Sequence, residues 1–268
     1  MPNTNLPTSD HATSRQLEQA AASNHTELFC QNALARGGEV AQRDGMIYTY
    51  DGPDHQSMIA FPSLDGSSAD GRLDEMMAWY ATRPNKGIGC WSLDPPGPAD
   101  LGDRLKARGF QDGWRPCWMA LDLGEMLEGH EYPRGLRIVM DNEMSLEAVK
   151  DLPYTGRDGA ISSEMLHYHP DRVRRFVALS KGRIVGHSAV FFTTGTYGAV
   201  GVYNVAVIPS ARRQGIGKAL VAAACLLGQE KGHRYAVLNA TGPQMYEQMG
   251  FQHVGEGFTW WRFPQAGA

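Results

Sequence analysis

Apolar residues along this chain repeat with two periods, about two residues in some stretches and about 3.6 in others, which are typical of strands and helices respectively. The pattern predicts helices over residues 15–36, 69–82, 100–108, 145–151, 216–231 and 244–249. It predicts strands over residues 40–51, 57–61, 89–93, 114–123, 136–140, 174–179, 183–193, 202–208, 235–239 and 260–263. Both kinds of element occur in both halves of the chain, so the pattern indicates an α/β fold built on mixed sheets.

The clearest pattern is a strand, a short loop and a helix over residues 202–231. The strand is a run of β-branched and small apolar residues that ends at Pro209. The helix has apolar residues at helical spacing, and Gly232 follows it as an expected C-cap. We therefore expect a buried central strand followed directly by an amphipathic helix.

The loop between this strand and this helix has the composition of an anion site. Gly215 and Gly217 allow the main chain to come close to a ligand, and the free N–H groups of a helix's first turn attract anions. Arg212, Arg213 and Lys218 add positive charge at the same end of the helix. The loop lacks the Gly-Lys-Ser/Thr ending of a Walker loop, and Leu220 stands where a dinucleotide-binding fingerprint has its third glycine. The loop is thus predicted to bind a diphosphate, but neither in the manner of a Walker loop nor in that of a dinucleotide-binding fingerprint.

The string from Arg212 to Gly217 matches Arg/Gln-x-x-Gly-x-Gly/Ala and follows a Val-Ala-Val-x-Pro strand. In this it resembles the GNAT acyltransferase superfamily, in which the pattern binds the pyrophosphate of acetyl-coenzyme A. The resemblance implies a pantetheine arm that enters between two splayed parallel strands and bonds to the main chain of the first, as an added strand would. The cofactor-binding residues implied are Val205, Ala206, Val207, Arg212, Arg213, Gln214, Gly215, Ile216, Gly217 and Lys218.

Tyr246 is the expected catalytic residue. It lies in a Met-Tyr-Glu-Gln-Met-Gly-Phe stretch that resembles the Leu-Tyr-x-x-Leu-Gly-Phe of the family, where the hydroxyl is the general acid near the coenzyme sulfur. A phenol with a pKa of about 10 remains protonated at neutral pH, as a proton donor must. Asn239, seven residues earlier, is a further candidate for binding the pantetheine or a bridging water.

The general base is not evident in the sequence. Many GNAT members have a glutamate at the start of the central strand, but this chain has Tyr203 and Asn204 in that region. A water relay remains possible, as does a base from elsewhere, and the candidate residues are Glu164, His167, His169 and His187. The His-x-His pair at 167 and 169 has no third ligand nearby in the sequence, so no metal site is expected.

The two halves of the chain resemble each other weakly. Residues 105–111 parallel residues 246–252, and each segment joins a short helix to a strand that contains tryptophan. The resemblance therefore implies two GNAT-like modules in tandem, of which the first has lost its anion loop. The expected divisions are a disordered lead-in over 1–14, a degenerate module over 15–128, a linker over 129–134 and a catalytic module over 135–268.

Charge and cysteine content restrict the partners and the compartment. Residues 1–134 have a net charge of −8 and residues 135–268 one of +4, so the half with the anion loop is the basic one. The sequence has no run of basic residues that would indicate nucleic-acid binding. The four cysteines are scattered along the chain without a paired spacing, which indicates free thiols and a reducing compartment. The chain shows no signal peptide or transmembrane pattern, so we expect a cytoplasmic protein that does not bind membranes.

Three functions follow as hypotheses. The first is an N-acetyltransferase that moves the acetyl group of acetyl-CoA to the amine of a small molecule. The second is an acyl-CoA-binding module without turnover, which lacks a carboxylate on the central strand because it has no need of a general base. The third is an acetyltransferase whose acceptor is a protein amine.

Overall fold

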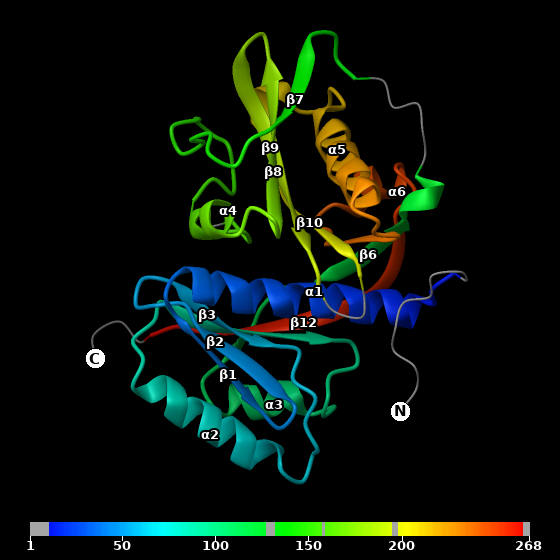
Figure 1. Cartoon of the computed structure of the whole chain (residues 1–268). Coiled ribbons are helices and arrows are strands. Elements are labelled where there is room, and N and C mark those ends of the chain that lie inside the picture. Colours follow the sequence, from blue (N-terminus) through cyan, green and yellow to red (C-terminus); the bar gives the residue numbers. More distant parts are fainter. Residues whose placement is uncertain (1–10, 127–131, 157–158, 195–197, 265–268) are drawn as a thin grey trace. The chain divides into compact units, whose positions relative to one another are not determined.

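Figure 1 shows the computed structural model of the chain, which describes residues 11–126, 132–156, 159–194 and 198–264. Most of the expected lead-in, residues 1–10, and part of the expected linker, residues 129–131, lie outside these residues. The described chain divides by internal contacts into two compact units. Unit 1 comprises Met1–Asn24 and Trp118–Val254, and unit 2 comprises His25–Cys117 and Gly255–Ala268.

Unit 2 is built on a mixed sheet, in which most neighbouring strands are antiparallel and one pair is parallel. Its strands are β1 (Glu39–Arg43), β2 (Met46–Tyr50), β3 (Gln56–Ala60), β4 (Gly87–Leu93), the short β5 (Gln111–Asp112) and most of β12 (Gln252–Arg262). β1, β2 and β3 are antiparallel, β3 and β4 are parallel, and β12 is antiparallel to both β4 and β5. The helices are α2 (Ala69–Ala81) and α3 (Leu101–Lys106), together with the second part of α1 (Ser14–Ala35).

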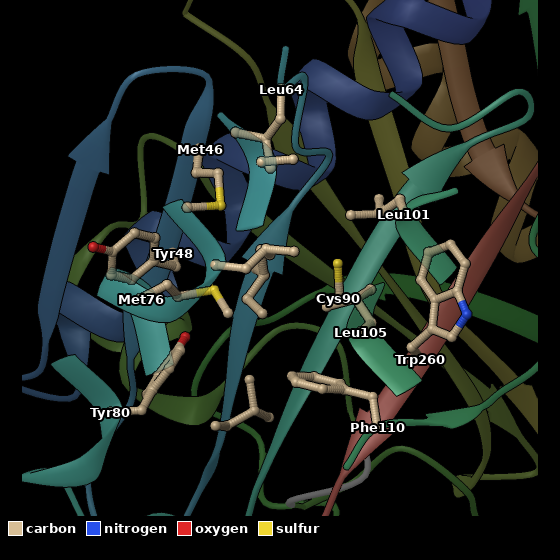
Figure 2. Packing of buried hydrophobic residues seen from close by; sticks show 14 of the residues in the cluster. Met46, Tyr48, Leu64, Met76, Tyr80, Cys90, Leu101, Leu105, Phe110 and Trp260 are labelled. Atoms are coloured by element: carbon tan, nitrogen blue, oxygen red, sulfur yellow. The ribbon is translucent and has the colours of Figure 1, made fainter. Parts of the chain in front are cut away.

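The core of unit 2 forms where α2 and α3 pack on this sheet (Figure 2). The helix predicted over residues 69–82 has an apolar stripe of Leu73, Met76, Met77 and Tyr80. Leu73, Met76 and Tyr80 are buried, and Figure 2 shows Met76 and Tyr80 beside Tyr48 of β2. The Tyr80 hydroxyl donates to the carbonyl of Thr49 at 2.9 Å, so the one polar atom of this buried ring is satisfied. Met76 is therefore a core residue and the half-buried Met77 packs against the core, as the helical spacing predicts.

The sheet strands of unit 1 lie in the order β6-β11-β10-β9-β8-β7. Its strands are β6 (Cys117–Asp122), β7 (Leu136–Met140), β8 (Val173–Ser180), β9 (Arg183–Phe192), β10 (Val200–Val207) and β11 (Tyr235–Asn239). Its helical elements are η1 (Leu123–Glu125), α4 (Ser163–Tyr168), η2 (Pro209–Ala211), α5 (Ile216–Glu230) and α6 (Pro243–Glu247). β8 and β9, both predicted as strands, form a hairpin in which Lys181 and Gly182 both have positive φ, as a tight two-residue turn requires.

Each unit is completed by a strand from the other half of the sequence. β6 ends the first half of the chain, yet it is antiparallel to β11 over the five pairs from Tyr235↔Asp122 to Asn239↔Trp118. β12 ends the second half, yet it pairs with β4 from Gly257↔Leu93 to Arg262↔Ile88. The two strands whose sequences resemble each other have therefore been exchanged between the halves.

Three of the elements expected from the pattern differ clearly in the structure. The strand expected over residues 260–263 begins eight residues earlier and is β12, Gln252–Arg262. Residues 40–51 are two strands and not one, because Asp44 and Gly45, the latter at φ +84°, turn the chain into the β1–β2 hairpin. Residues 145–151 form consecutive turns in place of the expected helix. This segment runs into Asp151 at φ +60° and then Pro153, neither of which continues a helix.

Among the described residues, none of the helices combines the length and the hydrophobicity needed to cross a lipid bilayer.

Candidate active site

The two parallel strands at the centre of unit 1 separate partway along their length. The β10–β11 ladder consists of the pairs Val200↔Ala236 and Gly201↔Val237. Both strands continue past this ladder, β10 to Val207 and β11 to Asn239. The second part of β10 therefore presents main-chain groups toward β11 that this ladder does not use.

A β-bulge in β10 accounts for the separation. The register against β9 shifts between Tyr203 and Ala206, so that Asn204 and Val205 together stand opposite Ser188. Asn204 has φ +52°, a left-handed conformation that asparagine adopts more readily than most residues. A bulge bends its strand and increases the local twist, which turns β10 away from its parallel neighbour.

The loop after β10 places positive charge and free N–H groups at the start of α5. Arg212 is fixed at the end of β10, where its Nε donates to the carbonyl of Val207 at 3.0 Å. Arg213 at φ +63° and Gly215 at φ +79° then turn the chain in two left-handed steps into Ile216, the first residue of α5. The N-cap is Gly215, which has no side chain to cap the first turn, so it leaves the first-turn N–H groups to an anion.

The other residues predicted for the loop continue along the same turn. Gln214 is exposed, and Gly217 and Lys218 are half-buried in the first turn of α5. Gly217 lies against α6, since a Cβ at this position would be 2.9 Å from Sδ of Met245. The anion loop and the helix that carries Tyr246 are thus in contact through a glycine.

Tyr246 is a half-buried phenol on α6. Its ring packs edge-on against Phe251 at a centroid distance of 5.8 Å. Burial, and secondly the charge of Tyr154, raise the pKa of Tyr246 to about 12. The hydroxyl therefore remains protonated well beyond neutral pH, which suits a proton donor and excludes a phenolate base.

Asn239 is the last residue of β11 and is half-buried. It pairs in register with Trp118 of β6. It thus stands on the strand that faces the diverging part of β10, at the carboxyl end of β11.

Tyr203 and Asn204, which replace the expected strand carboxylate, are both structural. The Tyr203 hydroxyl is buried and donates to Oδ1 of Asn24, and burial raises its pKa well above the ordinary value. Oδ1 of Asn204 accepts from the N–H of Ala160 at 2.8 Å, and its Nδ2 donates to the carbonyl of Ile161 at 3.5 Å. Neither side chain is placed to act as a general base.

The other candidate bases lie on α4 and β9. Glu164 and His167 belong to α4, and His169 is its C-cap. His167 is exposed, with Nδ1 3.6 Å from a Glu143 carboxylate oxygen. His187 is buried on β9, and its Nε2 donates to the carbonyl of Pro153 at 2.7 Å, the role of a core residue. The described residues contain no group of three or more His, Cys, Asp or Glu side chains placed to hold a metal ion.

Two residues that contact or influence the site residues could not be found from the sequence. Asn24 donates through Nδ2 to the hydroxyl of Thr193 at 2.6 Å, besides accepting from Tyr203, and so ties α1 to the central strands of unit 1. Tyr154 lies in an irregular loop, and its electrostatic effect on Tyr246 depends on the folded chain. Asn204 did carry a signal, because asparagine is depleted in strands and tolerates the positive φ of a bulge.

Unit 2 repeats the strand–helix–strand order without these features. The parallel ladder of β3 and β4 continues through five pairs, from Gln56↔Gly87 to Ala60↔Trp91, so these strands remain together. Asp65, whose carboxylate accepts from Ser67, lies in the connection to α2, and Asp70 lies in the first turn of that helix. The helix start in unit 2 is therefore acidic where that of unit 1 is basic.

Comparison with known families finds a match within the second half of the chain. The sequence of residues 171–253 matches the family described as an acetyltransferase (GNAT) domain. Residues 171–253 are a GNAT domain. The splayed strands, the anion loop and the helix of Tyr246 all lie within this segment. No curated protein matches the chain significantly.

Solved structures of GNAT proteins share the fold over most of the chain. A GCN5-related N-acetyltransferase from Kribbella flavida is similar with a TM-score of 0.67 at 17% identity, over 90% of this chain and 95% of that one. A tandem GNAT protein from the clavulanic acid biosynthesis pathway is similar with a TM-score of 0.57 at 11% identity, over 94% and 97%. A GCN5-related N-acetyltransferase from Sphaerobacter thermophilus gives 0.53 at 16%, over 84% and 76%. The predicted α/β fold of the GNAT type is confirmed, and it supports acyl transfer from acetyl-CoA in general.

Proposed function

We propose that the protein is an N-acetyltransferase that uses the site in unit 1 to move an acetyl group from acetyl-CoA to the amine of a small molecule. The observation that carries the proposal is the divergence of β10 from β11 directly before a glycine-rich, basic helix start. An extended thioester arm needs an unpaired strand segment, and its diphosphate needs an anion site at the end of that segment. Unit 1 has the two side by side.

The main chain of Val205, Ala206 and Val207 binds the pantetheine arm in this mechanism. An N–H group of the same segment polarises the thioester carbonyl and stabilises the negative charge that develops on its oxygen. The first turn of α5, with Arg213 and Lys218, binds the diphosphate. Asn239 binds the arm from the opposite strand.

Tyr246 completes the transfer as general acid. The neutral amine of the acceptor attacks the carbonyl carbon, so a C–N bond forms as the C–S bond breaks. Tyr246 donates its proton to the departing sulfur, and the proton lost by the amine goes to solvent through water. The raised pKa of Tyr246, about 12, keeps the donor loaded at the pH of the cell.

A second candidate function has its own observation in favour. The side chain of Asn204 is engaged by Ala160 and Ile161, and residues 200–208 contain no carboxylate. An acyl-CoA-binding module without turnover would need no base, so this arrangement also fits a binder.

Turnover separates the two candidates. The full chain is incubated with acetyl-CoA and a panel of primary amines, and release of the free thiol is followed with a thiol-reactive dye. The N-acetyltransferase proposal predicts amine-dependent thiol release and an acetylated amine detectable by mass spectrometry. Binding of acetyl-CoA without release across the panel would favour the binding module, whereas acetylated polypeptides from a lysate, with no small amine modified, would favour a protein acceptor.

A further inference from the structure

The β-bulge at Asn204 lies directly before the segment of β10 that the proposed function assigns to the thioester arm, residues 205–207. The part of β10 before the bulge is fixed. Residues 200–201 pair with β11, and the buried hydroxyl of Tyr203 donates to Oδ1 of Asn24. The path of residues 205–207 relative to β11 is therefore decided at the bulge.

The side chain of Asn204 joins the bulge to a segment outside the sheet. Its Oδ1 accepts from the N–H of Ala160 at 2.8 Å, and its Nδ2 donates to the carbonyl of Ile161 at 3.5 Å. The first distance is that of an ordinary hydrogen bond and the second is long, so the bond to Ala160 is the stronger of the two. The bulge is thus held by a contact that the neighbouring strands do not supply.

The segment that receives these bonds is held in place without Asn204. The side chain of Ile161 is buried, with 3% of its surface exposed. The next residue, Ser162, is the N-cap of α4, and its Oγ accepts from the N–H of Met165 at 3.1 Å. Residues 159–161 are therefore a support to which the bulge is tied, and not a loop that follows the bulge.

Close packing restricts the amide of Asn204 further. A Cβ on Gly159 would be 3.2 Å from Nδ2 of Asn204, which is closer than ordinary van der Waals contact. The backbone of Gly159 therefore lies directly against this amide, so hydrogen bonds and a packing contact fix the same group. Asn204 has φ +52°, and a left-handed residue other than glycine persists where surrounding contacts hold it. The contacts with residues 159–161 are of that kind.

We propose that Asn204 is a positioning residue for acyl-CoA, whose bond to Ala160 holds the bulge so that residues 205–207 remain turned away from β11, in the path that binds the thioester arm. Asn204 acts through the main chain that follows it and does not touch the ligand. A segment that is already in its bound conformation loses less conformational freedom on binding, so the arm binds more tightly. The inference rests on the proposed function, because it takes residues 205–207 as the site of the arm.

The proposed diphosphate site is anchored separately from the bulge. The N–H of Ile208 donates to the carbonyl of Val185 at 2.9 Å, so the end of β10 remains bonded to β9. The helix turn that is proposed to bind the diphosphate begins beyond this bond, at Gly215. Loss of the Asn204 bonds should therefore weaken the contact with the arm and leave the contact with the diphosphate unchanged.

Two ligands separate these contacts in titration calorimetry of the full chain. The nucleotide 3′-phosphoadenosine 5′-diphosphate has the adenosine and the phosphates of acetyl-CoA but lacks the arm. In Asn204→Gly the glycine adopts φ +52° without cost, so this variant removes the side-chain bonds and keeps the backbone conformation accessible. It should weaken the binding of acetyl-CoA about three- to tenfold and change the affinity for the nucleotide less than about twofold.

Further variants test the bond from both sides. Ala160→Pro removes the N–H donor and leaves Asn204 intact, and it should reproduce the selective loss of acetyl-CoA affinity. Asn204→Asp keeps an acceptor for Ala160, and it should keep the wild-type ratio of the two dissociation constants within about twofold. The matched control is Asn142→Gly, which removes a side chain of unit 1 that is also bonded to main-chain groups, and it should keep this ratio as well.

The ratio of the two dissociation constants decides the inference, in variants that remain folded by circular dichroism. An unchanged ratio in Asn204→Gly, or in Ala160→Pro where the glycine variant does not fold, would overturn it. Tolerance of positive φ would then be the whole role of Asn204. A ratio that changes equally in Asn142→Gly would also overturn it, because general loosening of unit 1 would be the cause. So would an Asn204→Asp variant that behaves like Asn204→Gly, since the bond to Ala160 would then not matter.

These three results leave the proposed function intact. A wild type that binds the nucleotide as tightly as acetyl-CoA would contradict the proposed site of the arm and, with it, the inference. A wild type that binds acetyl-CoA more tightly but acetylates no amine would contradict the acetyl transfer alone, because binding by itself measures the role of Asn204.

Discussion

Gly217 is the residue at which the requirements of the anion loop and of the catalytic helix meet. It lies in the first turn of α5 and leaves room for Met245, the neighbour of Tyr246. A side chain here would meet Met245 of α6, in the first turn of the helix whose N–H groups are proposed to receive an anion. The glycine therefore serves both the proposed diphosphate contact and the approach of α6.

Gly217→Asp should weaken the binding of coenzyme A at least tenfold, about 1.4 kcal/mol, because it adds a negative charge to the helix turn that is proposed to receive the diphosphate. An aspartate in the first turn favours the helix itself, so loss of fold is not the expected cause. Gly71→Asp, in the first turn of α2 with no atom within 4 Å of its added Cβ, is the matched control and should leave affinity unchanged. Calorimetry that finds equal affinities for folded Gly217→Asp and wild type would contradict the placement of the diphosphate.

Tyr246→Phe should lower kcat by about 10²–10⁴ with a change of no more than a few-fold in coenzyme A affinity, because it removes a proton donor and keeps the ring. The pKa of Tyr246, about 12, also predicts the direction in which the rate changes with pH. Since the phenol remains protonated until pH approaches this value, the wild-type rate should rise as the amine loses its proton and show no fall up to about pH 10. An alkaline loss of rate with a midpoint below pH 10 that Tyr246→Phe abolishes would contradict this assignment. Tyr50→Phe, in unit 2, is the control.

At the scale of elements, the exchange of β6 and β12 decides how the chain holds together. A cut in the expected linker removes β6 from the sheet of unit 1 and β12 from the sheet of unit 2. The freed neighbours, β11 and β4, would then expose unpaired edges and apolar faces. Neither half of the sequence is a complete folding unit in this structure.

Fragments 1–128 and 129–268 should therefore each fail to unfold cooperatively in urea when expressed alone, and should regain one cooperative transition when expressed together. Circular dichroism follows the transition, and the uncut chain is the control. We also expect fragment 1–128 alone to bind no coenzyme A. Cooperative unfolding of either isolated fragment would show that the exchanged strand is dispensable.

The sequence predicted the elements around the site well, because local patterns determine them. The β-branched run before Pro209, the glycines at 215 and 217, and the Lys181-Gly182 turn each specify their own conformation. The exchange of strands was beyond prediction, since β6 and β12 have similar sequences and only contacts distant in the chain decide which one pairs with β11. The Asp44-Gly45 turn was missed although its dipeptide is a hairpin signal, and the conformation of Tyr154 has no local signal.

At the scale of the whole molecule, buried acidic groups make stability depend on pH at the alkaline end. Burial raises the pKa of the Cys225 thiol to about 12 and that of the Cys90 thiol further, and it raises the pKa of Tyr80 and Tyr203 well above their ordinary values. In the unfolded chain thiols lose their protons near pH 8.5 and phenols near pH 10. Between these values and about pH 12, the unfolded state releases protons that the folded state retains, so stability falls as pH rises.

The free energy of unfolding should therefore drop by at least about 2 kcal/mol between pH 8 and pH 11. Urea titrations at these two pH values measure it, and Cys225→Ala, which removes one of the titrating thiols, should show a shallower drop than the wild type. A free energy that is constant over this range would mean that these groups are less buried than the structure shows.

The number of acetyl-CoA molecules bound per chain tests the central claim most directly. Unit 1 has separated parallel strands and a basic helix start, whereas unit 2 has a continuous parallel ladder and an acidic one. Titration calorimetry of the full chain with acetyl-CoA should give one site per chain, and Gly217→Asp should weaken that site. Two sites per chain, or one site that Gly217→Asp leaves unchanged, would contradict the account.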